Sequence, residues 1–242
     1  MNSPSSTVFA TYALTVGLLG ACSQSEHTQE VHFDQAIREV VLDVDYGRLR
    51  IRGDDRRGVA MLAYTSWEGR GEVAAEASVN GGQLRIDVTC PRAASPCDAA
   101  IQLVVPRDAA IVAFVGGGDV AVEKTVGSLD LSVGSGSVTL GGVGGRTSVV
   151  VERGDVVGME LRSGTAWAET GVGDLHLQFA EAPEEVSAST DVGDVSIGVP
   201  KGFYNVYADA SAGEVNLDIC LSAQSERRIF VRSGIGDVAV CQ

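Results

Sequence analysis

Acidic residues recur directly after glycines in the second half of the chain, at a spacing that could hold cations. This column reads Asp119, Ser137, Asp155, Asp174, Asp194, Glu214 and Asp237. If one repeat holds about 18–20 residues, these side chains stack about 4.8 Å apart, where like charges repel by roughly 1 kcal/mol. Divalent cations such as Ca²⁺ take oxygen ligands, so one interpretation is a cation ladder formed by the six carboxylates. The other is that Gly-Asp is favourable turn chemistry, and no metal site is established by the pattern alone.

Five cysteines offer a second kind of chemistry. Cys22 ends the run Leu19-Gly20-Ala21-Cys22, which resembles a bacterial lipobox, whose cysteine is acylated. The other four allow three disulfide connectivities. In an oxidising compartment we expect Cys90 to pair with Cys97 and Cys220 with Cys241. The alternative is four free thiols in a reducing compartment.

The segment before Cys22 has the form of an export signal. Val8 to Ala21 is uncharged and mostly apolar, and it is too short for a comfortable membrane span. Residues 1–7 depart from a usual signal peptide because they hold no Lys or Arg. We expect a signal peptide over 1–21 and a lipid-anchored polar tether over 22–35. Ser23 after the cysteine favours the outer membrane by the best-known bacterial sorting rule.

Catalytic motifs are not found in the sequence. The three histidines are His27 and His32 near the expected tether and His176, which we expect to face outward on a strand. Nucleophile-elbow, zinc-type and phosphate-loop patterns are all missing from the chain. The sequence also does not match the calcium-binding nonapeptide roll, because aliphatic residues such as Val120 occupy the positions where that roll needs Asp.

Other polar and aromatic residues could mark a binding surface. Arg227-Arg228 is an unusual basic pair in a chain of net charge −14. Trp67 and Trp167 fit either exposed binding aromatics or ordinary packing. The acidic balance argues against nucleic acid and against charge-driven adsorption to anionic lipid.

The composition predicts many short strands. Hydrophobic residues make up 45% of the chain, aromatics only 5%, and there are 30 glycines. From residue 118 the glycines recur at intervals of nine or ten, at 118, 127, 136, 145, 154, 164 and 173. Most are followed by apolar residues two and four positions later, which places one face of a strand inward. Thr147, Gly158 and Ala166 occupy inward positions and predict a flat or distorted unit there.

These patterns predict an all-β fold, a β-solenoid or β-helix-like stack with about 18–20 residues per coil. Looser alternation begins at Val40, and no convincing amphipathic helix occurs. We expect one domain over 36–242, with a looser capping half over 36–110 and regular repeats over 111–242.

Three segments resemble a known bacterial family. They are Thr190–Ile197, Ala210–Leu217 and Ile101–Ala109, and together they are similar to the candidate-adhesin domain, a β-strand-repeat family largely of unknown function. The resemblance covers about residues 40–242. It implies a β-solenoid-like body and an envelope location, and it offers no catalytic residues to transfer.

The sequence therefore predicts a cell-envelope lipoprotein that acts as a non-catalytic structural or binding module, including adhesion, through flat strand faces. Its expected partners are the membrane, through the lipid, and an unknown protein or glycan. No cofactor is expected apart from the Ca²⁺ considered above. The alternatives are an envelope polysaccharide-active enzyme on the same scaffold and an accessory protein of an envelope sensor.

Overall fold

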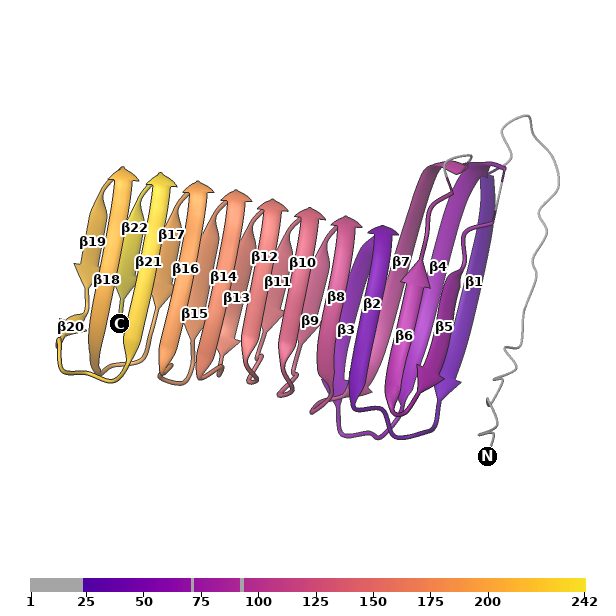
Figure 1. Ribbon diagram of the computed structural model, residues 1–242, viewed down its shortest axis with the longest axis horizontal. Coiled ribbons are helices and arrows are strands. Elements are labelled where there is room, and N and C mark those ends of the chain that lie inside the picture. The colour runs from indigo at the N-terminus through magenta and orange to yellow at the C-terminus, as the bar shows by residue number, and fades with distance from the viewer. Residues whose placement is uncertain (1–23, 71, 92–93) are drawn as a thin grey trace.

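The computed structural model describes residues 24–70, 72–91 and 94–242 (Figure 1). The expected signal peptide and Cys22 lie outside this range. The described residues form 22 strands and contain no helix, so none of them builds a helix able to cross a bilayer. The all-β prediction is confirmed.

The strands form two eleven-stranded mixed sheets. Sheet A has the spatial order β1 (Gln24–Phe33), β4 (Val59–Gly69), β7 (Ala94–Pro106), β3 (Arg48–Asp54), β9 (Val120–Glu123), β11 (Val138–Gly141), β13 (Val156–Leu161), β15 (Leu175–Phe179), β17 (Val195–Gly198), β22 (Val238–Cys241) and β19 (Val215–Asp218). Sheet B has the order β20 (Cys220–Leu221), β18 (Phe203–Ala212), β21 (Arg228–Ile235), β16 (Glu185–Val192), β14 (Thr165–Val172), β12 (Thr147–Arg153), β10 (Leu129–Ser135), β8 (Ala110–Gly117), β2 (Glu39–Tyr46), β6 (Gln83–Val88) and β5 (Ala75–Asn80).

The register of the strands follows the glycine spacing, because residues that pair on neighbouring strands are two glycine intervals apart in the sequence. In sheet A, Val138 pairs with Val120 on one side and with Val156 on the other. In sheet B, Leu129 pairs with Ile111 and Thr147 in the same way. Each partner is 18 residues away, so successive phrases enter the two sheets alternately. The strands between β8 and β17 are therefore all parallel to their neighbours (Figure 1).

The core lies between the two sheets and is aliphatic. Residues at equivalent positions stack in columns, and one column in sheet A is at most 1% exposed; it contains Val120, Val138, Val156, Leu175, Val195 and Val238. Full burial of such a side chain contributes about 1.5–3 kcal/mol. The alternation of apolar and polar residues thus sets which face of each strand turns inward.

The irregular unit expected near residues 147–166 is present. The register between β13 and β15 shifts between Gly158 and Leu161, and Glu160 adopts a positive φ of 53°. A Cβ on Gly158 would lie 2.7 Å from Leu161 Cδ1, so Leu161 fills the space that the glycine leaves. Thr147 is satisfied by the Ser163 hydroxyl at 2.8 Å.

The first part of the chain both joins the parallel stack and closes its end. Strands β2 and β3 pair in parallel with β8 and β9, whereas β1, β4 and β5 pair antiparallel with their neighbours. The expectation of a tether over 22–35 is wrong for residues 24–33. These residues form β1, whose alternating polar and apolar residues pair with β4 over ten positions.

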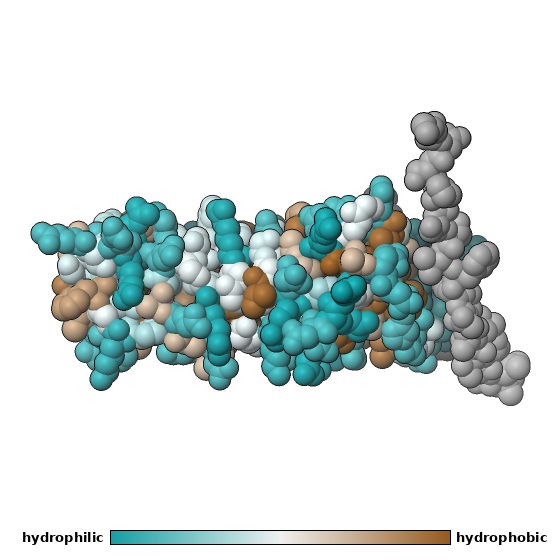
Figure 2. Space-filling view, turned by 90° about the horizontal axis from the view of Figure 1, so that it is seen from below, coloured by the Kyte–Doolittle hydropathy of each residue, from teal (hydrophilic) through white to brown (hydrophobic). Residues whose placement is uncertain are grey.

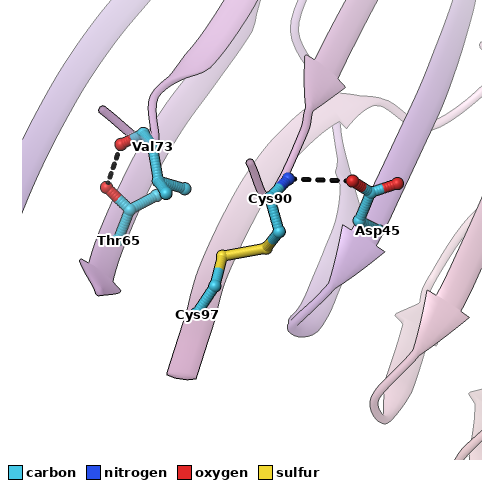
Figure 3. The surroundings of a disulfide bond; sticks show 5 residues. All are labelled: Asp45, Thr65, Val73, Cys90 and Cys97. Atoms are coloured by element: carbon cyan, nitrogen blue, oxygen red, sulfur yellow. Dashed lines mark hydrogen bonds between the residues drawn. A yellow bond between two sulfur atoms is a disulfide. The ribbon is translucent and has the colours of Figure 1, made fainter. Parts of the chain in front are cut away.

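A disulfide ties the two sheets together at this end (Figure 3). Cys90 follows β6 of sheet B and Cys97 lies in β7 of sheet A, and their Cα atoms are 6.0 Å apart. The Cys90 backbone N–H donates to the Asp45 carboxylate at 2.8 Å, and the Thr65 hydroxyl donates to the Val73 carbonyl at 2.7 Å (Figure 3). The predicted pairing of Cys90 with Cys97 is confirmed.

The last strands do not follow chain order. Strands β21 and β22 insert between β16/β17 and the earlier β18/β19, so β18 and β19, with the two-residue β20 beside β18, form the end of the stack (Figure 1). The predicted pairing of Cys220 with Cys241 is not formed, and both are free and exposed. Cys220 lies on β20 at the edge of sheet B, whereas Cys241 lies on β22 of sheet A, one strand in from the edge because of the inserted strand order.

This end of the stack is not closed. Inward-facing Val206, Ala208 and Leu217 of β18 and β19 are only partly buried, and Val215 is 44% exposed. Their register partners in β21 and β22 are fully buried, because they have a neighbouring strand on each side. Figure 2 shows brown and tan surface at this end, where Phe203 and Leu221 are exposed.

Candidate binding face

The acidic column exists, and backbone hydrogen bonds link its members. The backbone N–H groups of Asp174, Asp194 and Asp237 each donate to Oδ1 of the aspartate one unit before, at 2.7–2.9 Å. Asp119 receives the N–H of Ser137 at 3.0 Å. Each of these carboxylates thus faces an amide dipole as well as its charged neighbours.

The order of the column needs a correction. Asp237 follows Asp194 in space and Glu214 comes last, because β22 lies between β17 and β19. The Glu214 N–H donates to Asp237 Oδ1 at 2.8 Å. Among the described residues no group of three or more His, Cys, Asp or Glu side chains is placed to hold a metal ion. Cation binding by the column stays a prediction.

The glycine before each acidic residue is required by geometry. Gly173 has a φ of +149°, and a Cβ there would lie 2.1 Å from the Gly154 carbonyl oxygen. Buried hydroxyls bind the same carbonyls from the core side: Thr170 donates to Gly154 at 2.9 Å and Thr190 to Gly173 at 3.0 Å. The column is therefore an edge of fixed shape along the stack.

The histidines are not assembled into a catalytic group. His27 lies 3.8 Å from the Glu72 carboxylate and His32 lies 3.3 Å from that of Glu30, both near the first end of the stack. His176 is exposed in β15, in the middle of sheet A, as expected.

The two tryptophans have different environments. Trp67 is buried in β4 and packs in the core, whereas Trp167 of β14 is 52% exposed on the outer face of sheet B. Ser187, Phe230 and Tyr207 are its successive register partners on β16, β21 and β18. Phe230 and Tyr207 are exposed as well. We call Trp167, Ser187, Phe230 and Tyr207 the aromatic row.

Two hollows lie beside this row at the beginnings of the sheet B strands. The first has a volume of 610 Å³ and includes Trp167, Ser187, Ser148, Asp130 and Arg146. The second has a volume of 830 Å³ and includes Phe203, Ser225, Arg227 and Arg228. Both are lined by Thr165 and Glu185, so they adjoin. We call the two hollows together the trough.

The trough crosses the strands rather than following one of them. Its lining residues run from Ile111 on β8 to Phe203 on β18. Six strand spacings separate these strands in sheet B. At about 4.8 Å each, the trough is about 29 Å long.

One ion pair lies in the lining of the trough, and a second lies elsewhere on sheet B. Arg228 lies 2.9 Å from Glu185, and Arg232 lies 3.8 Å from Asp209 on the neighbouring strand. The Arg227 guanidinium lies over the ring of buried Tyr204, 5.8 Å from its centroid. Burial raises the pKa of the Tyr204 hydroxyl, which donates to the Pro200 carbonyl at 2.9 Å and so remains a protonated donor.

The sequence identified only part of this face. Trp167, Arg227 and Arg228 stand out by residue type, but Phe203, Tyr207 and Phe230 are not singled out by any motif. The signal that could find them is the alternation within β18 and β21, where aromatic residues occupy outward positions. Their place beside Trp167 depends on the inserted strand order, which no local pattern encodes.

Comparison with known proteins gives distant structural neighbours. No family model and no curated protein matches the chain. A candidate adhesin from Bacteroides fragilis is 12% identical, with 89% of this chain and 98% of that one covered and a TM-score of 0.45. A candidate cell adhesion protein from Clostridium sporogenes is also 12% identical, with 91% and 100% covered and a TM-score of 0.37.

A third crystal structure is that of a candidate lipid binding protein from Parabacteroides distasonis. It is 10% identical, with 89% of this chain and 97% of that one covered and a TM-score of 0.40. Proteins described as candidate adhesins are thus among the solved structures to which this chain is similar.

Proposed function

We propose that this chain is a non-catalytic binding module of the bacterial cell envelope, serving adhesion or attachment, and that the outer face of sheet B carries its ligand. The observation behind the proposal is the aromatic row on a rigid sheet, with the trough beside it. Exposed aromatic groups gathered on one face are typical of interaction surfaces.

The scaffold suits a fixed binding surface. Each aromatic ring of the row is mounted on a strand whose backbone is hydrogen-bonded within sheet B, so its position is set by register. We further propose that the two sheets are the walls of a β-solenoid with about 18–20 residues per coil. In such a stack each unit contacts mainly its neighbours, which gives long, regular faces.

The envelope location in this proposal rests on the predicted signal peptide and lipid attachment at Cys22. Metabolic labelling with a palmitate analogue tests it, comparing the wild-type chain with Cys22→Ser. We expect label on the wild type and none on the variant. Equal labelling of both proteins would remove the anchor from the proposal.

The binding function is tested with the fluorescently labelled chain and intact bacterial envelopes. We expect saturable retention on the envelopes that unlabelled protein competes away, together with no release of reducing sugar ends during long incubation. Non-saturable retention would contradict a binding module. Steady release of reducing ends would instead support the polysaccharide-active enzyme.

A further inference from the structure

We infer that the trough binds a linear, uncharged glycan chain, with Trp167 and Phe203 as stacking platforms. This inference rests on the proposed binding function and specifies its ligand. Three features carry it: the separated aromatic rings, the mixture of hydrogen-bonding groups along the trough, and the near balance of charge.

The aromatic rings are exposed where nothing in the fold requires them. Trp167 lines the first hollow, and Phe203, 65% exposed, lines the second. The face of an aromatic ring is electron-rich, and it packs well against the C–H bonds on the flat side of a sugar ring. Strands β14 and β18 lie three strand spacings apart, about 14 Å, so the two platforms fit separated sugar units of one chain.

Groups that suit hydroxyls flank Trp167 on both sides: Ser187 on the side toward Phe203, and Ser148, Asp130 and Arg146 on the other side. Ser148, Ser187 and Thr165 both donate and accept hydrogen bonds, Asp130 accepts them, and Arg146 donates them. A sugar hydroxyl also donates and accepts, so it can satisfy each of these groups. A purely apolar ligand would leave them without partners, which costs free energy.

The charge of the trough argues for a neutral ligand. Its lining holds four carboxylates and three guanidinium groups, namely Asp130, Glu184, Glu185, Glu226, Arg146, Arg227 and Arg228. The Arg228–Glu185 pair at 2.9 Å neutralises both partners locally. In a protein of net charge −14, a polyanionic glycan would meet repulsion around a trough that offers no excess positive charge.

The position of the trough argues against an extended peptide. Peptides that bind as an added strand use the free backbone groups of a sheet edge. The trough lies on the face of sheet B, across strands β8 to β18. Strands β10 to β21 pair with neighbouring strands on both sides, and β18 pairs with β20 at Phe203 and Tyr204. A ligand here must bind through ring faces and side chains, as a glycan does.

Isothermal titration calorimetry with neutral linear hexasaccharides tests the inference, using cello-, xylo-, laminari- and chitohexaose. We expect at least one to bind the wild-type chain, and Trp167→Ala and Phe203→Ala each to weaken that binding about tenfold or more. Tyr64→Ala is the matched control, because Tyr64 is an exposed aromatic residue on sheet A. We expect it to change affinity less than twofold.

Parallel titrations use alginate as an acidic polymer and a library of extended ten-residue peptides. Binding of only alginate, binding of only peptides, or equal loss of affinity in Tyr64→Ala would each overturn the glycan inference. Circular dichroism confirms that each variant is folded.

The envelope assay separates this inference from the proposed function. If the chain still binds envelopes but all hexasaccharides fail and Trp167→Ala binds envelopes normally, the glycan inference is wrong and the binding module stands. If envelope binding is itself absent, the proposed function fails.

Discussion

The glycines that precede the acidic column must satisfy two requirements, a positive φ and the absence of a Cβ, and no other residue type satisfies both. Gly173 has a positive φ of +149°, and its α-carbon lies so close to the preceding unit that a Cβ would approach the Gly154 carbonyl oxygen to 2.1 Å. Gly142 also has a positive φ, of +62°, but a Cβ there would meet nothing within 4 Å. The two positions separate backbone conformation from close packing.

We predict that Gly173→Ala lowers the free energy of unfolding by about 3 kcal/mol or more, because it adds a steric clash to an unfavourable φ. Gly142→Ala should cost about 1–2 kcal/mol, since only the left-handed conformation is unfavourable. Urea denaturation of both variants measures the difference. Equal destabilisation would contradict the close approach between stacked glycines.

The carboxylates of the column have a structural role that can be measured. Asp174 accepts the Asp194 backbone N–H at 2.8 Å, much as a helix-capping side chain does. We predict that Asp174→Ala costs about 1 kcal/mol and that Asp174→Asn retains most of the stability, because the amide oxygen still accepts the bond. Urea unfolding midpoints of the three proteins provide the comparison.

A calcium titration of the melting temperature addresses the other interpretation of the column. If hydrogen bonding is the whole role, excess Ca²⁺ and chelator give the same melting temperature. A rise with Ca²⁺ that disappears in Asp174→Asn would establish the cation ladder instead.

The disulfide acts at the level of whole strands, since it joins β6 of sheet B to β7 of sheet A. Its loop spans seven residues of separation, for which chain-entropy arguments give about 2.5 kcal/mol. We predict that Cys90→Ala/Cys97→Ala loses about this much stability, as measured by thermal melting. Cys220→Ala/Cys241→Ala serves as the control and should melt near the wild type, because both thiols are free and exposed. The reverse result would contradict the assignment of the bond.

The sequence predicts individual strands better than their order. Alternation at positions such as Val120 and Val122 fixes which face is buried, because one strand's pattern is a local property. Gly158 also signals an irregular unit correctly. The insertion of β21 and β22 between earlier strands depends on long-range contacts. The sequences of these two strands do not differ visibly from those of the other strands. For the same reason β1 could not be distinguished from a polar tether: its pairing with β4 needs the partner strand.

Across the whole molecule the two ends differ. The first end is closed by antiparallel strands and a disulfide, whereas β18 and β19 leave inward-facing residues partly exposed at the other. Sheet B carries the aromatic row and the trough, and its strand register sets the spacing of their side chains. The residues that define this face come from distant parts of the chain, which is why the sequence identified Trp167 but not its neighbours.

Hydroxyl-radical footprinting of the chain, free and bound to envelope fragments, tests most directly whether sheet B is the binding face. We predict that oxidation of Trp167, Phe203 and Tyr207 falls about fivefold or more on binding, because ligand excludes solvent from buried interface residues. Oxidation of Tyr64 on sheet A should not change. Protection of Tyr64 with no protection of Trp167 would contradict the account.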